Sequence, residues 1–274
     1  MTYILLDTGH QKKLEKFGDF AIVRPCSQAL WAPALPSSEW ERADAHFTRE
    51  EKNQWRFKRK FPESWVVEIE GVKFKLSSTD FGHLGVFPEH SQLWTWARTK
   101  VREANRPVNV LNLFAYSGGA TSALAQGGAK VCHLDASKGM VAWARENAAL
   151  NGLKEAPIRW IVEDVIKFLK REIKRGSRYD GIILDPPSFG RGNQGEIFKI
   201  EGDIIPLLQL CRQLLVEKPL FLILSSHTPG MTPIVMESLL KQIMPKGTIE
   251  SGEIVISSPT GFSLPCGSFG RWYV

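Results

Sequence analysis

The segment Val108–Gly119 reads VNVLNLFAYSGG, and it decides the fold. Its apolar run, rich in branched side chains, stops at Ser117-Gly118-Gly119 and leads into the Ala-rich stretch Ala120–Gln126. This order predicts a strand, a tight glycine turn and a helix. Three further predicted strands end in acidic residues, namely Asp135, Glu163-Asp164 and Asp185. In an open parallel sheet the carboxyl ends of the strands form the edge where ligands bind.

Beyond this segment, apolar strand-like runs and helix-like runs alternate as far as Met244. That alternation predicts an α/β fold with a Rossmann-like, doubly wound and mostly parallel sheet. No helix separates the last two predicted strands, Ile249–Ser257 and Ser268–Val274, so they are expected to pair as an antiparallel hairpin. Short strands near the N-terminus predict a small β-rich region. We expect residues 1–90 to form a cap or substrate-binding region and residues 91–274 to form the main domain.

The composition fits a folded protein of one large domain plus an appendage, because 43% of the 274 residues are hydrophobic. A net charge of +6 favours a polyanionic partner. The four cysteines lie far apart without a Cys-x-x-Cys pair, which disfavours a zinc site and predicts reduced thiols in a cytoplasm. No apolar stretch is long enough to span a bilayer, so a cytoplasmic location without a membrane contact is expected.

Basic and aromatic side chains alternate in the segment Thr48–Lys60. Such a mixture can follow a nucleic-acid backbone and stack on bases, which predicts an RNA contact. The candidate residues are Arg49, Lys52, Trp55, Arg56, Lys58, Arg59 and Lys60. The alternative interpretation is a solvated edge whose aromatic residues belong to the core.

The glycine turn excludes two common ligand types. It lacks the Gly-x-Gly-x-x-Gly pattern of dinucleotide sites, and no Walker lysine follows it. The turn still allows a small ligand to approach the backbone, and the following helix N-terminus could hold a carboxylate. Asp135 is placed to accept both hydroxyls of a ribose, and Asp164 to hold an adenine amino group. Together they predict S-adenosylmethionine, although each acid taken singly could be a helix N-cap.

Four motifs carry a resemblance to a known family: Leu113–Gly119, Asp135–Lys138, Ala144–Asn147 and Asp185–Phe189. They resemble the class I S-adenosylmethionine-dependent methyltransferases, and more narrowly the bacterial group that includes the large-subunit ribosomal RNA methyltransferases I and K. The resemblance implies methylation of an RNA base, with ribosomal RNA as the expected substrate. It implies cofactor contacts by Phe87, Pro88, Phe114, Tyr116, Ser117, Gly118, Gly119, Asp135, Ala136, Ser137, Glu163, Asp164 and Asp185. The implied catalytic motif consists of Asp185, Pro186, Pro187 and Phe189.

The residue types of the catalytic motif suit a planar acceptor. A carboxylate or carbonyl beside a stiff Pro-Pro pair is a fixed acceptor for N–H groups, and Phe189 offers a face for stacking. The methyl group of a sulfonium is already activated, so the protein mainly aligns and desolvates the reactants for direct in-line transfer. No metal is expected to be needed. A base within a duplex would have to be flipped out or be presented in a single strand.

Several interpretations remain open at this point. Cytosine-C5 members of the group use a cysteine after the fifth strand, where this chain has Ser225–Pro229, so that route is disfavoured. Cys266 is either a replacement nucleophile or a buried residue of the closing turn. His83 is either a proton carrier or structural. A methyltransferase of proteins or small molecules, and a non-catalytic adenosyl-binding module, are the alternative functions.

Overall fold

The computed structural model describes residues 2–49, 52–192, 195–244 and 246–274, and the chain divides into two compact units. The first unit holds Met1–Glu89 and Val255–Cys266, and the second holds His90–Ile254 and Gly267–Val274. The boundary predicted between residues 90 and 91 thus lies beside the junction of the units. The tip of the C-terminal hairpin, which the sequence assigned to the main domain, groups with the first unit.

The second unit is built on a seven-stranded sheet with the order β10-β9-β8-β11-β14-β16-β15. Five strands run parallel to their neighbours, and β16 runs antiparallel to β14. The strands are β8 (Asn109–Leu113), β9 (Lys130–Asp135), β10 (Ile158–Val162), β11 (Gly181–Leu184), β14 (Phe221–Ser226), β15 (Thr248–Ser257) and β16 (Ser263–Tyr273). The predicted α/β class and the antiparallel end of the sheet are confirmed. The strand order reverses beside β8, which makes the carboxyl ends of β8 and β11 the topological switch point.

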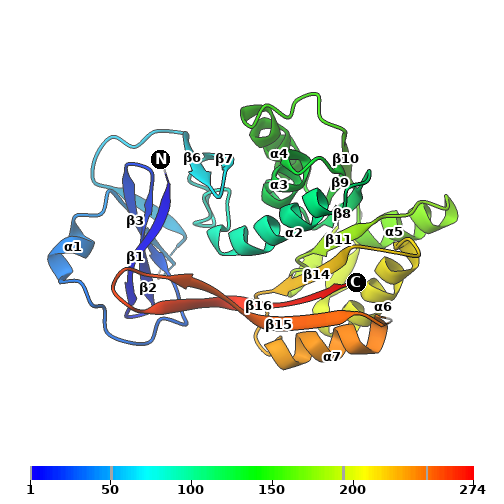
Figure 1. Cartoon of the computed structure of the whole chain (residues 1–274). Coiled ribbons are helices and arrows are strands. Elements are labelled where there is room, and N and C mark those ends of the chain that lie inside the picture. Colours follow the sequence, from blue (N-terminus) through cyan, green and yellow to red (C-terminus); the bar gives the residue numbers. More distant parts are fainter. Residues whose placement is uncertain (1, 50–51, 193–194, 245) are drawn as a thin grey trace. The chain divides into compact units, whose positions relative to one another are not determined.

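Helices cover both faces of this sheet, as Figure 1 shows. One layer consists of α2 (Ser91–Glu103), α3 (Gly119–Gln126) and α4 (Lys138–Leu150), and the other of α5 (Val165–Lys174), α6 (Ile200–Leu214) and α7 (Pro233–Ile243). Side chains fix where several helices begin, since Ser137, Asp164 and Thr232 each accept a hydrogen bond from a backbone N–H in the first turn. Pro233 follows Thr232 at the first helical position, where its missing N–H has no cost.

A large apolar cluster of the second unit lies between the sheet and the α5–α7 layer. Every residue of β11 and β14 is buried, as expected for parallel strands covered on both faces. Leu184 and Leu222 from these strands share one apolar cluster with Phe168 of α5, Leu207 of α6 and Met236 of α7. The central strands are therefore held rigidly, and so are the residues that follow their carboxyl ends. A short hairpin, β12 (Phe189–Arg191) with β13 (Ile197–Lys199), follows β11.

The first unit is β-rich, as predicted. Its five-stranded sheet has the order β1-β2-β3-β4-β5, in which only β3 and β4 are parallel. The elements are β1 (Tyr3–Gly9), β2 (Lys12–Phe17), β3 (Phe20–Pro25), α1 (Ser37–Glu41), β4 (Ala45–Thr48), β5 (Gln54–Phe57), β6 (Trp65–Ile69) and β7 (Val72–Leu76), with the 3-10 turn η1 (Pro88–His90) at the junction. Among the described residues, no helix is long and apolar enough to cross a bilayer.

Candidate functional site

The register of the parallel strands brings the predicted site residues of the second unit to one edge. Leu113, the last residue of β8, lies beside Leu134 and Leu184, and Leu184 lies beside Leu224. Asp135, which ends β9, lies beside Val162 at the end of β10. The residues that follow these positions therefore share the carboxyl edge of the sheet. This is the arrangement predicted from the strand ends.

The turn after β8 adopts a backbone conformation that few side chains tolerate. Phe114, Tyr116 and Gly118 have φ angles of 53°, 49° and 82°. Non-glycine residues with positive φ are uncommon and concentrate at functional sites. A Cβ on Gly118 would lie 2.9 Å from the Cβ of Ala144, so this position requires glycine for space as well as for φ. The turn thus packs closely against α4 at Gly118.

Two side chains hold the glycine turn in place. The Oδ2 atom of Asp135 accepts a 2.9 Å hydrogen bond from the Tyr116 N–H, and the Asn147 amide donates a 2.9 Å bond to the Ser117 carbonyl. The other oxygen of Asp135 accepts a 2.8 Å bond from the Ser137 N–H. Burial raises the pKa of Asp135, and these two backbone donors oppose the rise. Asp135 therefore organises the loop itself, with lone pairs remaining on both oxygens for a ligand.

A buried polar chain lies behind the turn. The Asn112 amide donates to Oγ1 of Thr121 at 2.9 Å, and Oγ1 lies 2.9 Å from Nδ1 of His133. The Thr121 hydroxyl can donate to or accept from Nδ1 of His133, so this contact suits a neutral ring in either tautomer. Burial lowers the pKa of His133 to about 3, so this histidine stays uncharged at neutral pH. Its place is structural, between β9 and the helix that follows the turn.

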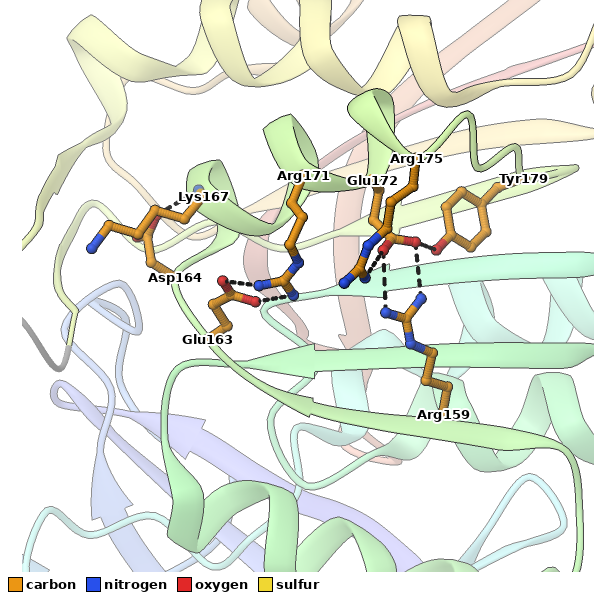
Figure 2. Close-up of polar contacts among 8 residues, drawn as sticks. All are labelled: Arg159, Glu163, Asp164, Lys167, Arg171, Glu172, Arg175 and Tyr179. Carbon is orange, nitrogen blue, oxygen red and sulfur yellow. Dashed lines mark hydrogen bonds and ion pairs between the residues drawn. The ribbon is translucent and has the colours of Figure 1, made fainter.

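The acidic pair after β10 is engaged in structural contacts, as Figure 2 shows. Asp164 caps α5, because its Oδ1 accepts a 2.9 Å hydrogen bond from the Lys167 N–H. Glu163 forms a two-pronged ion pair with Arg171, in which Nη1 lies 2.6 Å from Oε1 and Nη2 contacts Oε2. Asp164 is therefore a helix N-cap, as one of the two interpretations predicted. Its predicted contact with adenine stays a prediction.

A second carboxylate cluster in Figure 2 stabilises the α5 layer. The buried Glu172 accepts hydrogen bonds from Arg159 at 2.9 and 3.1 Å, from Arg175 at 3.1 Å and from the Tyr179 hydroxyl at 2.8 Å. Burial acts to raise the pKa of Glu172, but these donors outweigh it and lower the pKa to about 2. The cluster ties β10 to α5, the two elements between which Glu163 and Asp164 lie.

The predicted catalytic motif follows β11 at the switch point. Asp185 is half-buried, and its Oδ1 accepts a 2.8 Å hydrogen bond from the hydroxyl of Ser225 in β14. Pro186 is buried, Pro187 is exposed, and Phe189 begins β12 with 49% of its surface exposed. The carboxylate is thus held from a neighbouring strand, and an aromatic face is available close to it in sequence.

Two histidines that the sequence did not single out lie beside Asp185. The Nε2 atoms of His90 and His227 are 3.0 Å apart, and each lies 3.9 Å from Oδ2 of Asp185. His90 precedes α2 and His227 follows β14, so three distant segments meet here. The sequence analysis missed the three neighbours of Asp185, which are Ser225, His90 and His227. It also missed Arg171, the partner of Glu163. The segment Ser225–Pro229 was noted only as the place where some members of the group have a cysteine, and long-range packing is needed to show these contacts.

The remaining predicted residues belong to the first unit. Phe87 and Pro88 lie just before the junction, and their role at the cofactor stays a prediction. His83 packs its ring against Phe87, and burial lowers the pKa of His83. Cys266 is buried and its thiol contacts the Leu264 carbonyl at 3.5 Å. Burial also raises the pKa of Cys266, which favours the closing-turn interpretation over a reactive thiolate.

The basic cluster of the first unit is exposed, while its aromatic residues pack together. Arg49, Lys52, Arg56, Lys58, Arg59 and Lys60 are all exposed. Trp55 stacks on Phe57 with ring centroids 5.9 Å apart, and Phe57 stacks on Phe61 at 4.9 Å. Arg59 is 2.5 Å from Asp44, so it already has an acidic partner. The cluster offers cations and the exposed ring of Phe57 to a partner, while Trp55 is bound to the Thr79 carbonyl.

Comparison with known proteins supports one family. Residues 14–239 match the family model described as S-adenosylmethionine-dependent methyltransferase. The chain is 42% identical to the SAM-dependent methyltransferase from Agrobacterium tumefaciens, whose crystal structure matches with a TM-score of 0.96, covering 100% of this chain and 90% of that one. A protein solved in complex with S-adenosylhomocysteine is 20% identical with a TM-score of 0.76, covering 99% and 75% of the two chains, and shares the fold.

Among curated proteins, the ribosomal RNA large subunit methyltransferase K/L of Shewanella frigidimarina is 38% identical over 132 residues, which are 48% of this chain and 18% of that protein. The protein of the same name from Pseudoalteromonas atlantica is 38% identical over 141 residues, 51% of this chain and 19% of that protein. The chain spans about a fifth of the length of the curated relatives it matches.

Proposed function

Since the chain belongs to the family of S-adenosylmethionine-dependent methyltransferases, we propose that it methylates a base of RNA, with ribosomal RNA as the expected substrate. The observation that carries this proposal is the shared carboxyl edge of β8, β9 and β11. There the strained turn after Leu113 and the carboxylate of Asp135 lie next to the Asp185 motif.

The residues of the second unit suit an adenosyl cofactor. Phe114, Tyr116, Ser117 and Gly118 of the turn would line the methionine end of the cofactor. The missing Cβ of Gly118 lets this turn pack closely against Ala144 of α4, which fixes the position of the turn. Asp135 would bind the ribose hydroxyls, supported by Ala136 and Ser137, while Glu163 and Asp164 would contact the adenine. Arg171 holds Glu163 by two bonds, which would keep the adenine side of the site in place.

When bound, S-adenosylmethionine supplies a methyl group on a sulfonium, which needs no further activation. Asp185 would orient the acceptor by accepting hydrogen bonds from its N–H groups, and Ser225 fixes the carboxylate for that task. Phe189 would stack on the acceptor base, and the Pro186-Pro187 pair keeps the backbone between them stiff. The chain thus contributes alignment and exclusion of water, which can account for much of a rate enhancement.

Two observations support RNA as the substrate. The curated relatives that match about half of the chain are named as ribosomal RNA methyltransferases. The exposed cations Arg49, Lys52, Arg56, Lys58 and Lys60 of the first unit provide charge for phosphate contacts.

The direct test uses methyl-labelled cofactor and ribosomal RNA from a strain that lacks this gene. We expect label in the RNA and one methylated nucleoside on mass spectrometry after digestion. Asp185→Ala should abolish transfer while calorimetry still detects S-adenosylhomocysteine binding. Label that enters protein or small molecules, and never RNA, would favour the alternative substrate classes. Cofactor binding without transfer to any acceptor would favour a non-catalytic module.

The basic cluster is tested separately, by the salt dependence of RNA binding. Replacing Arg56, Lys58 and Lys60 by alanine should weaken binding and lower the slope of log K against log salt by about 0.7 to 1 for each phosphate that is no longer neutralised. Lys154→Ala, an exposed lysine of the second unit, is the matched control and should leave the slope unchanged. Equal slopes for the triple variant and the wild type would remove the cluster from the RNA interface.

A further inference from the structure

His90, Asp185 and His227 bring three metal-ligating atoms close together. They come from the start of α2, the end of β11 and the residue after β14, and all belong to the second unit. Each offers one ligand atom, and these three atoms lie within 4.8 Å of one another. Two imidazoles and one carboxylate are a donor set that transition metals prefer.

The distances among the three atoms fit a single ion. The two Nε2 atoms are 3.0 Å apart, and each is 3.9 Å from Oδ2 of Asp185. The point equidistant from all three atoms therefore lies about 2.1 Å from each. Zinc binds histidine nitrogen at about 2.0–2.1 Å and carboxylate oxygen at about 2.0–2.2 Å. The distances among the three atoms therefore suit an ion of this size.

The surroundings fix the carboxylate for such a role. The buried Ser225 hydroxyl donates to Oδ1 of Asp185 at 2.8 Å, on the oxygen that does not face the histidines. Hydrogen bonds of this kind orient metal ligands and raise their affinity. The side chains of His90, Asp185 and His227 are 16%, 28% and 40% exposed, so an ion could enter from solvent and would still be partly sheltered.

We propose that His90, Asp185 and His227 form a binding site for one divalent transition-metal ion of the zinc and cobalt type. In the metal-free protein one Nε2 donates a hydrogen bond to the other. When the ion binds, both Nε2 atoms become ligands and each neutral imidazole carries its proton on Nδ1. Three protein ligands leave at least one coordination position for water or another ligand. The imidazoles favour Zn²⁺ and Co²⁺ over the oxygen-seeking Mg²⁺ and Ca²⁺. Asp185 also belongs to the proposed catalytic motif, and the ion would use its Oδ2 atom. Metal binding itself can be measured without RNA methylation.

The experiment titrates the full chain, freed of metal by a chelator, with Co²⁺ and then with Zn²⁺, without cofactor or RNA. Visible absorption should report one bound Co²⁺ per chain, displaced by one equivalent of Zn²⁺. His90→Ala and His227→Ala remove a direct ligand, so each should lower affinity by about 100-fold or more, beyond the 10- to 100-fold typical of outer contacts. Ser225→Ala should lower it about 10-fold. His83→Ala, in the other unit, should bind like the wild type.

Thermal unfolding gives a second readout that separates ligand loss from misfolding. Metal-free His227→Ala should unfold cooperatively near the temperature of the wild type, because this histidine is substantially exposed. Saturating Zn²⁺ should raise the Tm of the wild type and of His83→Ala but not that of His227→Ala, since only a metal that binds the native state stabilises it. If Co²⁺ and Zn²⁺ fail to bind, or bind His227→Ala and His90→Ala as tightly as the wild type, the proposed site does not exist. Because no methyl transfer is measured, this result is independent of the proposed function.

Discussion

The Ser225 hydroxyl donates a 2.8 Å hydrogen bond to Oδ1 of Asp185, so that β14 fixes the carboxylate at the end of the neighbouring β11. Ser225 is buried and Asp185 is half-buried, which means that water competes only weakly for this hydrogen bond. A hydrogen bond to a charged group contributes about 1.5–3 kcal/mol when it is made in the interior.

Ser225→Ala should therefore lower the rate of methyl transfer by about 10- to 100-fold. The carboxylate remains but no longer has the hydrogen bond that fixes its orientation, so kcat should fall while the affinity for S-adenosylhomocysteine stays near that of the wild type. Steady-state kinetics and calorimetry measure the two quantities. Ser238→Ala, on the exposed side of α7, is the control. An unchanged kcat in Ser225→Ala would show that Asp185 does not need this support.

Asp164 has a structural role and a proposed binding role, which two substitutions separate. Asp164→Ser keeps an N-cap for α5 but removes the carboxylate, whereas Asp164→Ala removes both. We expect Asp164→Ser to keep the stability of the wild type and Asp164→Ala to lose about 1 kcal/mol in urea unfolding. Both should bind S-adenosylhomocysteine about 10-fold more weakly, because each removes a hydrogen bond to a charged group. If Asp164→Ser binds S-adenosylhomocysteine as tightly as the wild type, Asp164 acts only as a helix cap.

The ionisation of Glu172 makes the free energy of unfolding depend on pH in the acid range. Its folded pKa of about 2 lies below its ordinary value of 4.5, so its stabilising effect is fully present above about pH 5 and disappears as pH falls toward 2. Glu172→Gln should lower the free energy of unfolding by about 1–3 kcal/mol at pH 7, and the difference from wild type should shrink as the pH is lowered. Urea unfolding at several pH values measures this. Glu155→Gln, an exposed carboxyl, should stay within about 0.5 kcal/mol. A Glu172→Gln difference that is constant with pH would contradict the assigned ionisation.

The sequence was sufficient where the signal is local. The branched run before Ser117 and the glycines after it predict β8, its turn and α3, because strand and turn preferences act over a few residues. The alternation of strand-like and helix-like runs also predicted that strands end at Asp135 and just before Asp185. The parallel register of the strands places both residues at one edge of the sheet. The side-chain contacts at this edge were beyond the sequence.

The residues that the sequence did not reveal belong to distant segments. Nothing near His90 or His227 in sequence indicates that they meet at Asp185, since their approach depends on the order of strands in the sheet and on the start of α2. The same holds for Ser225, which reaches Asp185 only because β14 lies beside β11. Asp164 is a different case, because its position at the end of a strand and the start of a helix suits both a helix cap and a ligand contact. The structure shows the helix cap, and the ligand contact stays a prediction.

The central claim is that the turn after β8 and Asp135 form the cofactor site. Asp135 accepts hydrogen bonds from the N–H groups of Tyr116 and Ser137. Its replacement would therefore disturb the loop as well as remove the proposed ribose contact. The most direct measurement is isothermal titration of S-adenosylhomocysteine into the wild type and into Asp135→Ala. We predict one site per chain in the wild type and an affinity at least about 100-fold weaker in the variant, as the removal of charged hydrogen bonds implies. Equal affinities of the two proteins, with Asp135→Ala fully folded, would contradict the placement of the cofactor at this edge of the sheet.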